Sequence, residues 1–128
     1  RITIADTIGY AIPSEVEFLM KKVLQIAGEI PIAIHLHDTR GFGLANAYSA
    51  YKVGVRIFET SVGGIGGCPF APGATGNLAT EDFVYLFNRM GISTGIDLEK
   101  LIEAANYGTR LTTNKALGRI RHIERKFL

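Results

Sequence analysis

The chain of 128 residues is 47% hydrophobic and 20% charged and has a formal net charge of +2, which is typical of a folded domain and excludes a disordered chain. No apolar run approaches the roughly 18 residues that cross a bilayer, so we expect no membrane partner. The single cysteine cannot form a disulfide within the chain, which favours a reducing compartment.

Hydrophobic periodicity predicts three strands that alternate with helices. β-branched or continuous apolar runs indicate strands at residues 1–6, 31–37 and 55–62. Apolar residues at helical spacing predict helices at residues 13–28, 43–53, 77–90 and 97–108. A glycine-rich loop is expected at residues 63–76, between the third strand and the third helix.

The C-terminal end of the chain is basic. Residues 119–128 hold four of the 14 basic residues but one of the 12 acidic ones, so the rest of the chain is close to neutral. A nucleic-acid interface needs a basic stripe across a folded surface, so we expect no nucleic-acid partner. We expect residues 109–128 to form a weakly patterned, solvated terminal helix.

Strands that alternate with helices predict a parallel α/β sheet with right-handed crossovers. Two architectures fit this order, an open doubly wound sheet and part of a (β/α)₈ barrel. A complete barrel takes about 250 residues, so this chain has the length of about half of one. The chain begins at Arg1 within a predicted strand, and we expect the rest of a barrel to lie outside it.

Two histidines, His35 and His37, end the second predicted strand. Residues two apart on a strand point to the same side, so both imidazoles face one way while Leu36 packs on the other. This geometry suits two ligands of one divalent cation. The alternative is a pair of histidines that only form hydrogen bonds at a strand end. We favour the metal because Asp38 follows directly and a second carboxylate, Asp6, ends the neighbouring strand.

Asp6 lies in the segment Asp6-Thr7-Ile8-Gly9. One interpretation is a cap for the following helix, a common role of aspartate. The other is a general acid or base, or a group that orients a histidine. The second interpretation is open because ligands of parallel α/β folds bind beyond the carboxyl ends of the strands.

The loop at residues 63–76 has six glycines among its 14 residues and carries Cys68. A phosphate-binding loop is one interpretation, but the glycines match no nucleotide fingerprint and no lysine follows. A lid that closes over substrate and carries the Cys68 thiol is the second, and a loose connection is the third. We favour the functional thiol because glycines and proline flank it, whereas most lone cysteines are buried in a core.

Asn77 and Glu81 follow this loop. Asn77 could cap the third helix or contribute a neutral oxygen ligand at the same rim. Glu81 is expected one turn later on the same helix face, either to support the site or only as an acid in a first turn.

Four segments together closely resemble the hydroxymethylglutaryl-CoA lyase family. In chain order they are Asp6-Thr7-Ile8-Gly9, His35-Leu36-His37-Asp38-Thr39, Gly63-Gly64-Ile65-Gly66-Gly67-Cys68-Pro69 and Gly76-Asn77-Leu78-Ala79-Thr80-Glu81-Asp82. The resemblance covers residues 1–108 and extends to the superfamily of metal-dependent TIM-barrel lyases and synthases. The synthases have a shorter loop without the Cys-Pro pair, so Cys68 favours the lyase branch.

The resemblance implies that residues 1–128 are one partial lyase domain, the C-terminal half of a (β/α)₈ TIM barrel with about strands 5–8. Residues 109–128 form a basic segment that matches the family poorly. The implied roles are a Mg²⁺ or Mn²⁺ ion held by His35, His37 and Asn77, catalysis by Cys68, Asp6 and His35, and support of the site by Glu81.

The implied reaction is cleavage of 3-hydroxy-3-methylglutaryl-CoA to acetyl-CoA and acetoacetate, a step of leucine catabolism and ketone-body formation. The implied partner is the acyl-CoA substrate, and the full-length enzyme is expected to be a homodimer. The expected location is the cytoplasm of a bacterium or the mitochondrial matrix of a eukaryote.

The chain departs from the family in one respect. The family's first strand carries an Asp-Arg-Glu signature that supplies a metal ligand and a catalytic arginine, and this signature is absent here. We therefore expect the isolated chain to be inactive or to self-associate. Two alternatives stay open: a related lyase or aldolase for another 3-hydroxyacyl-CoA or 3-hydroxy acid, and a truncated, non-catalytic module that binds a metal or a partner.

Overall fold

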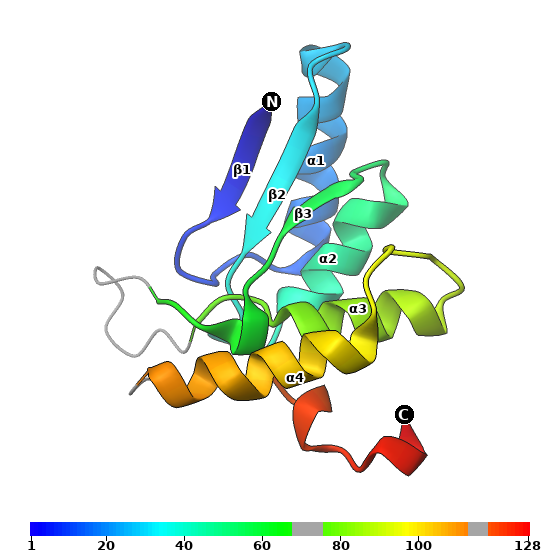
Figure 1. The fold of residues 1–128 in the computed structure, drawn as a ribbon. Coiled ribbons are helices and arrows are strands. Elements are labelled where there is room, and N and C mark those ends of the chain that lie inside the picture. Colours follow the sequence, from blue (N-terminus) through cyan, green and yellow to red (C-terminus); the bar gives the residue numbers. More distant parts are fainter. Residues whose placement is uncertain (68–75, 113–117) are drawn as a thin grey trace.

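The computed structural model describes residues 1–67, 76–112 and 118–128. This part of the chain contains the strands β1 (Ile2–Asp6), β2 (Ile32–Leu36) and β3 (Ile57–Glu59), and the helices α1 (Pro13–Ala27), α2 (Gly43–Lys52), α3 (Thr80–Arg89) and α4 (Leu98–Gly108) (Figure 1). The order confirms the predicted alternation of strands and helices. No helix in the described ranges is long and apolar enough to cross a bilayer.

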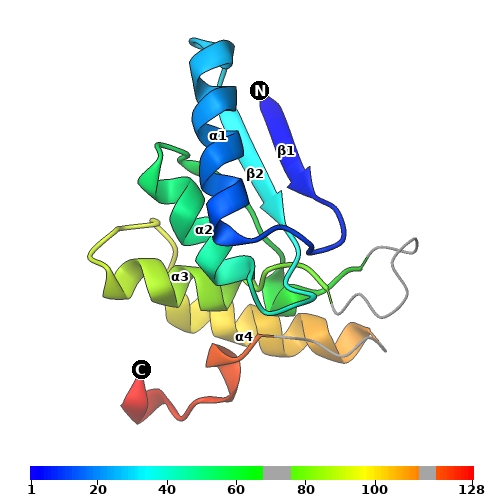
Figure 2. The same ribbon diagram turned by 180° about the vertical axis from the view of Figure 1, so that it is seen from behind.

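The three strands form one parallel sheet in the order β1-β2-β3. Helices α1 and α2 cover one face of this sheet, behind the strands in Figure 1 and in front of them in Figure 2. Ile34 pairs with Ile4 and Phe58, and all three pack against the helical core. The next pair in register, His35 and Glu59, points to the opposite, open face because successive residues of a strand alternate.

The core lies between the sheet and the helices. Met20 of α1, Leu36 of β2 and Val84 of α3 are almost completely buried there. Burial of each such side chain contributes about 1.5–3 kcal/mol to stability. Helices α3 and α4 pack against each other beyond the carboxyl ends of the strands, so they lie at the rim where the polar residues gather (Figures 1 and 2).

Two predicted boundaries are wrong. The third strand is Ile57–Glu59 rather than residues 55–62. Ser61 does not continue the pairing with β2 and instead forms a bridge with Ala79. The third helix begins at Thr80 rather than at Asn77, because Asn77 and Ala79 are extended and form bridges to His37 and Ser61. Both corrections have one cause, a short extended segment that inserts beside the ends of β2 and β3.

The C-terminal segment is not the solvated helix that we expect from its sequence. Its described part contains three short 3₁₀ turns, at Thr109–Leu111, Ile120–His122 and Arg125–Phe127. The backbone N–H groups of Arg119 and Ile120 donate to the buried carboxylate of Asp82. A side chain of the folded core therefore binds this segment and holds it against the protein.

Candidate functional site

The two histidines lie at the carboxyl end of β2, as predicted. His35 belongs to the strand and His37 follows its last residue. Their ring centroids are 5.0 Å apart and the rings are perpendicular. His37 is buried, with an exposed fraction of 7%, while His35 is partly exposed on the open face of the sheet. The two imidazoles are therefore close enough to act on one ligand.

The hydrogen bond of His37 determines which ring nitrogen is free. Nδ1 of His37 lies 3.1 Å from the backbone carbonyl oxygen of Asp6. A carbonyl oxygen can only accept a hydrogen bond, so Nδ1 carries the proton and donates it. In the neutral ring Nε2 then holds a free lone pair, which is the arrangement found in most metal-binding histidines.

Glu59 is a residue of the site that the sequence interpretation missed. Its Oε2 lies 3.6 Å from Nδ1 of His35, and its Oε1 accepts hydrogen bonds from Thr3 Oγ1 at 3.0 Å and Arg1 Nη2 at 3.1 Å. The carboxylate favours a proton on Nδ1 of His35, which leaves Nε2 of that ring unprotonated as well. A carboxylate near the carboxyl end of a predicted parallel strand was the signal that could have indicated it.

Asn77 lies beside His37 rather than at a helix end. The two residues form an isolated antiparallel bridge, which rules out the helix-cap interpretation of Asn77. The amide Nδ2 of Asn77 donates to the Ile65 carbonyl oxygen at 2.9 Å. Its Oδ1 is buried and has no hydrogen-bond partner among the described residues. A buried acceptor without a donor is costly, and a cation would satisfy it.

Asp6 is held in the turn that leads to α1. Its Oδ1 accepts from the Tyr10 N–H at 2.8 Å and its Oδ2 from the Ala11 N–H at 3.2 Å. The residue that precedes the first turn of α1 is Ile12, so Asp6 stabilises the preceding loop and does not cap the helix. In the described ranges no three His, Cys, Asp or Glu side chains gather as a metal site, so Asp6 does not form a third metal ligand with the two histidines.

Cys68 lies outside the described residues. Its predicted role stays a prediction.

Glu81 supports the start of the glycine-rich loop. It is completely buried on α3, and its Oε2 accepts from the Gly63 N–H at 2.9 Å. Since Asn77 precedes the helix, the two do not share a helix face as predicted. Burial raises the pKa of the Glu81 carboxyl, and the neighbouring charge of Asp82 raises it further; the Gly63 N–H and Arg121 offset only part of this rise.

A raised pKa makes the stability of the fold depend on pH through Glu81. The folded state prefers the neutral acid, so this stability is present below the ordinary pKa of 4.5 and is lost as the pH rises through the higher folded-state pKa. We expect Glu81→Gln to unfold like the wild type at pH 4 and to be more stable at pH 8. Urea unfolding at both pH values measures the difference.

Glu17→Gln is the control for this prediction, because Glu17 is partly exposed on α1 and Lys21 lowers its pKa. A Glu81→Gln variant whose stability relative to wild type stays constant between pH 4 and pH 8 would show that burial does not perturb this carboxyl.

Two more buried acids, Asp38 and Asp82, share the guanidinium of Arg119 near the site. Nη1 of Arg119 lies 3.2 Å from Oδ2 of Asp38 and 3.5 Å from Oδ2 of Asp82. The two carboxylates raise the pKa of Arg119 despite partial desolvation of its side chain. Asp38 also accepts from the Gly43 N–H at 2.7 Å, so it connects the end of β2 to the start of α2. Sequence reasoning did not connect these residues because they are far apart along the chain.

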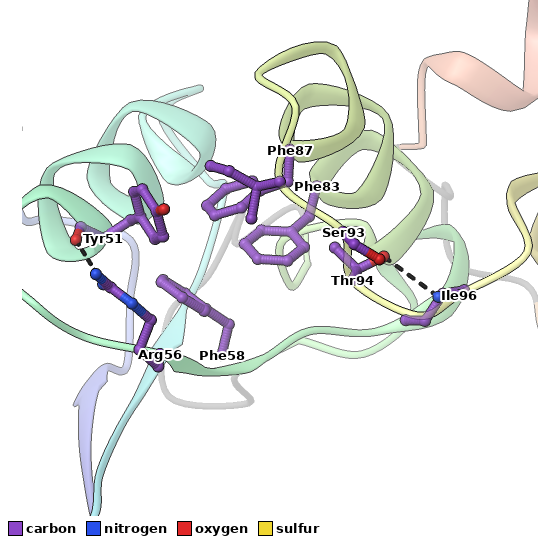
Figure 3. Close-up of a pocket in the computed structure, with 9 residues that line it drawn as sticks. Tyr51, Arg56, Phe58, Phe83, Phe87, Ser93, Thr94 and Ile96 are labelled. Atoms are coloured by element: carbon purple, nitrogen blue, oxygen red, sulfur yellow. Dashed lines mark hydrogen bonds between the residues drawn. The ribbon is translucent and has the colours of Figure 1, made fainter.

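An apolar pocket of about 320 Å³ lies on the other side of the sheet. Figure 3 shows Phe58, Phe83 and Phe87 converging on it, with Arg56 stacked over the ring of Tyr51. Phe83 and Phe87 are stacked with centroids 4.1 Å apart. The pocket belongs to the helical side of the edge strand β3 and is separate from the two histidines.

Comparison with known proteins identifies clear relatives. The profile of the family described as HMGL-like matches residues 1–107. The chain is 50% identical to (R)-citramalyl-CoA lyase of Chloroflexus aurantiacus over 84% of this chain and 34% of that protein. It is 47% identical to hydroxymethylglutaryl-CoA lyase of Bacillus subtilis over 84% of this chain and 36% of that protein.

A solved HMG-CoA lyase of Acinetobacter baumannii, in complex with coenzyme A and 3-methylmalate, superimposes with a TM-score of 0.89 at 42% identity. The superimposed region covers 97% of this chain and 41% of the solved chain, so it includes most of the C-terminal segment. The fold is that of part of an α/β barrel. The chain spans about a third of the length of the curated relatives that it matches.

Proposed function

The chain belongs to the HMGL-like family, and on that premise we propose that it forms part of a carbon–carbon lyase that cleaves 3-hydroxy-3-methylglutaryl-CoA to acetyl-CoA and acetoacetate. One observation carries the proposal. The rim beyond β2 holds two imidazoles with Nδ1 directed at oxygen acceptors, next to a buried amide oxygen that lacks a donor among the described residues.

These donors fit a divalent cation such as Mg²⁺ or Mn²⁺, held by His35, His37 and Asn77. An amide oxygen is a suitable ligand for such ions, and the unsatisfied Oδ1 of Asn77 gives the cation a place to bind beside the two imidazole nitrogens. When bound, the cation would act as a Lewis acid that lowers the pKa of the tertiary hydroxyl of the substrate.

The protein side chains have the remaining tasks of the reaction. The tertiary hydroxyl must lose its proton to a base before the carbon–carbon bond breaks. Asp6, at the end of the neighbouring strand β1, is the proposed base, because Nε2 of His35 would be occupied by the cation while its Nδ1 carries a proton toward Glu59. His35 would contribute to catalysis by holding the cation at the open face of the sheet. Asp6 acts in proton transfer at the same rim and holds His37 in position through its backbone carbonyl.

The enolate of acetyl-CoA must then receive a proton. In this proposal the Cys68 thiol donates it from the glycine-rich loop, which excludes water from the enolate. Glu81 holds the first residue of that loop through the Gly63 N–H.

The acyl-CoA thioester is the proposed partner, and the full-length enzyme is proposed to be a homodimer. In a bacterium the reaction would take place in the cytoplasm, and in a eukaryote in the mitochondrial matrix. Its products would serve leucine catabolism and ketone-body formation.

The experiment that tests the proposal is a chimera in which this chain replaces the matching third of the Bacillus subtilis lyase. We expect the chimera to release acetoacetate from 3-hydroxy-3-methylglutaryl-CoA with added Mg²⁺ or Mn²⁺, while the isolated 128-residue chain stays inactive. A folded chimera that cleaves citramalyl-CoA but not 3-hydroxy-3-methylglutaryl-CoA would overturn the substrate assignment, and one that cleaves neither would overturn the lyase assignment.

A further inference from the structure

The site is assembled from two segments that are joined by backbone hydrogen bonds. The first carries His37 at the end of β2, and the second carries Asn77 just before α3. Two hydrogen bonds join them: the Asp38 N–H donates to the Gly76 carbonyl at 3.1 Å, and the Leu78 N–H donates to the Leu36 carbonyl at 3.0 Å. These two bonds decide where the His37 ring and the Asn77 amide lie relative to each other.

Arg119 binds the residues that continue both segments. Asp38 directly follows His37, and Asp82 lies in the first turn of the helix that follows Asn77. Nη1 of Arg119 reaches both carboxylates, at 3.2 and 3.5 Å. The Arg119 backbone N–H also donates to Asp82, at 2.8 Å, so the main chain and the side chain of one residue hold this acid.

Burial makes these contacts more than a surface ion pair. The Arg119 side chain is 58% exposed, and an exposed pair would contribute little. The carboxylates, however, are only 4% and 3% exposed, so without Arg119 two buried carboxylates would lose the counter-ion that the described part of the chain provides. Asp38 belongs to the segment of His37 and Asp82 to the helix that follows Asn77, so Arg119 connects the two through their carboxylates.

The neighbouring residue keeps Arg119 in this position. A side chain at Gly118 would overlap the Glu81 carboxyl, and the Gly118 N–H lies 3.4 Å from the Gly63 carbonyl oxygen. The backbone before Arg119 therefore packs directly on α3 and on the start of the glycine-rich loop. This close packing fixes the backbone from which the Arg119 side chain reaches Asp38.

We propose that Arg119 is a positioning residue of the site, which clamps the segment of His37 to the segment of Asn77 and so sets the spacing of their donor atoms. The proposal rests on the cation site proposed above. It assigns a task in the site to a residue beyond residues 1–107, the range that the family profile matches. Loss of a residue that orients metal ligands typically weakens metal binding about 10- to 100-fold.

The test compares Arg119→Gln and Arg119→Lys with the control Arg125→Gln in the 128-residue chain. Arg125 is matched because it lies in the same segment and pairs with the exposed Glu99 at 2.8 Å, away from the site. Amide hydrogen exchange of the metal-free chain, followed by NMR, reports the two clamped bonds through the Asp38 and Leu78 amides. Titration with Mn²⁺, followed by electron paramagnetic resonance, measures the Mn²⁺ affinity, which falls if the donor atoms are no longer correctly spaced.

We expect Arg119→Gln to exchange the Asp38 and Leu78 amides about 10-fold faster than the control while the Ile34 amide in β2 is unchanged. We expect the Mn²⁺ dissociation constant to rise about 10- to 100-fold. Arg119→Lys should lie between, because an ammonium group keeps the charge but lacks the planar fork.

Unchanged amide exchange rates at Asp38 and Leu78 in both variants would overturn the proposal that Arg119 clamps the two segments. Exchange rates that rise equally at all amides of β2 would overturn it as well. Faster local exchange with wild-type Mn²⁺ affinity would overturn its role in donor spacing. A wild-type chain that binds no Mn²⁺ would instead overturn the cation site of the proposed function, and the exchange data would still decide whether Arg119 joins the two segments.

Discussion

Replacing His37 with alanine is expected to weaken Mn²⁺ binding by the chain by roughly 100-fold or more, at or above the upper end of the loss seen when a supporting residue is removed. Of the two imidazoles, His37 is the more buried, and its Nδ1 is fixed on the Asp6 carbonyl so that Nε2 is presented as the ligand. Alanine supplies no donor at this position and leaves the carbonyl oxygen without its partner. Isothermal titration calorimetry measures the change.

The third histidine of the chain is the matched control for this prediction. His122 is exposed and lies in a 3₁₀ turn of the C-terminal segment, so His122→Ala should bind Mn²⁺ like the wild type. His35→Ala should weaken binding as well, since it removes the second imidazole. Equal affinities of His37→Ala and His122→Ala would show that the rim beyond β2 binds no cation.

Replacing Gly76 with alanine is expected to destabilise the fold by about 3 kcal/mol, from backbone strain and overpacking together. Gly76 has a φ of +128°, which side-chain-bearing residues rarely adopt. An added Cβ would overlap the Gly64 carbonyl oxygen and lie 2.8 Å from that of Gly66, and backbone atoms cannot rotate away. Urea unfolding measures the loss.

The control variant Gly91→Ala separates the cost of backbone strain from the cost of steric overlap of the added Cβ. Gly91 also has a positive φ, of +74°, but an added Cβ there would meet nothing within 4 Å. We expect its cost to be about 1 kcal/mol, the strain component alone. Because Asn77 follows Gly76, the Gly76→Ala variant should also lose Mn²⁺ affinity, whereas Gly91→Ala should keep it. A Gly76→Ala variant no less stable than Gly91→Ala would show that the loop accommodates the extra methyl group.

The sequence was sufficient for those features that depend on local periodicity. The predicted helices at residues 13–28 and 97–108 are confirmed within a residue or two, because a proline or an N-cap aspartate starts each one. Contact between the two histidine rings was predictable because residues two apart on a strand point to the same face, independently of where the strand lies in the fold.

Features that depend on distant partners could not be predicted in this way. Residues 77–79 have a helix-compatible sequence, but the Leu78 N–H donates to the Leu36 carbonyl at the end of β2 and the Leu78 carbonyl accepts from the Ser61 N–H, beyond β3. Similarly, Arg119 looks like one charge of a solvated tail until the fold places two buried carboxylates beside it. Tertiary hydrogen bonds outweighed the local preference at both positions.

The contact between Asp38 and Arg119 also has a consequence for the order of folding. The two residues are 81 positions apart in the chain, whereas β1, α1 and β2 are near neighbours in sequence. Closing the larger loop costs more chain entropy, so the β-α-β unit forms first and the ionic contact forms afterwards. During synthesis Arg119 leaves the ribosome after β1, β2 and β3, so we expect the rim beyond β2 to acquire its final shape only after residue 119 has emerged.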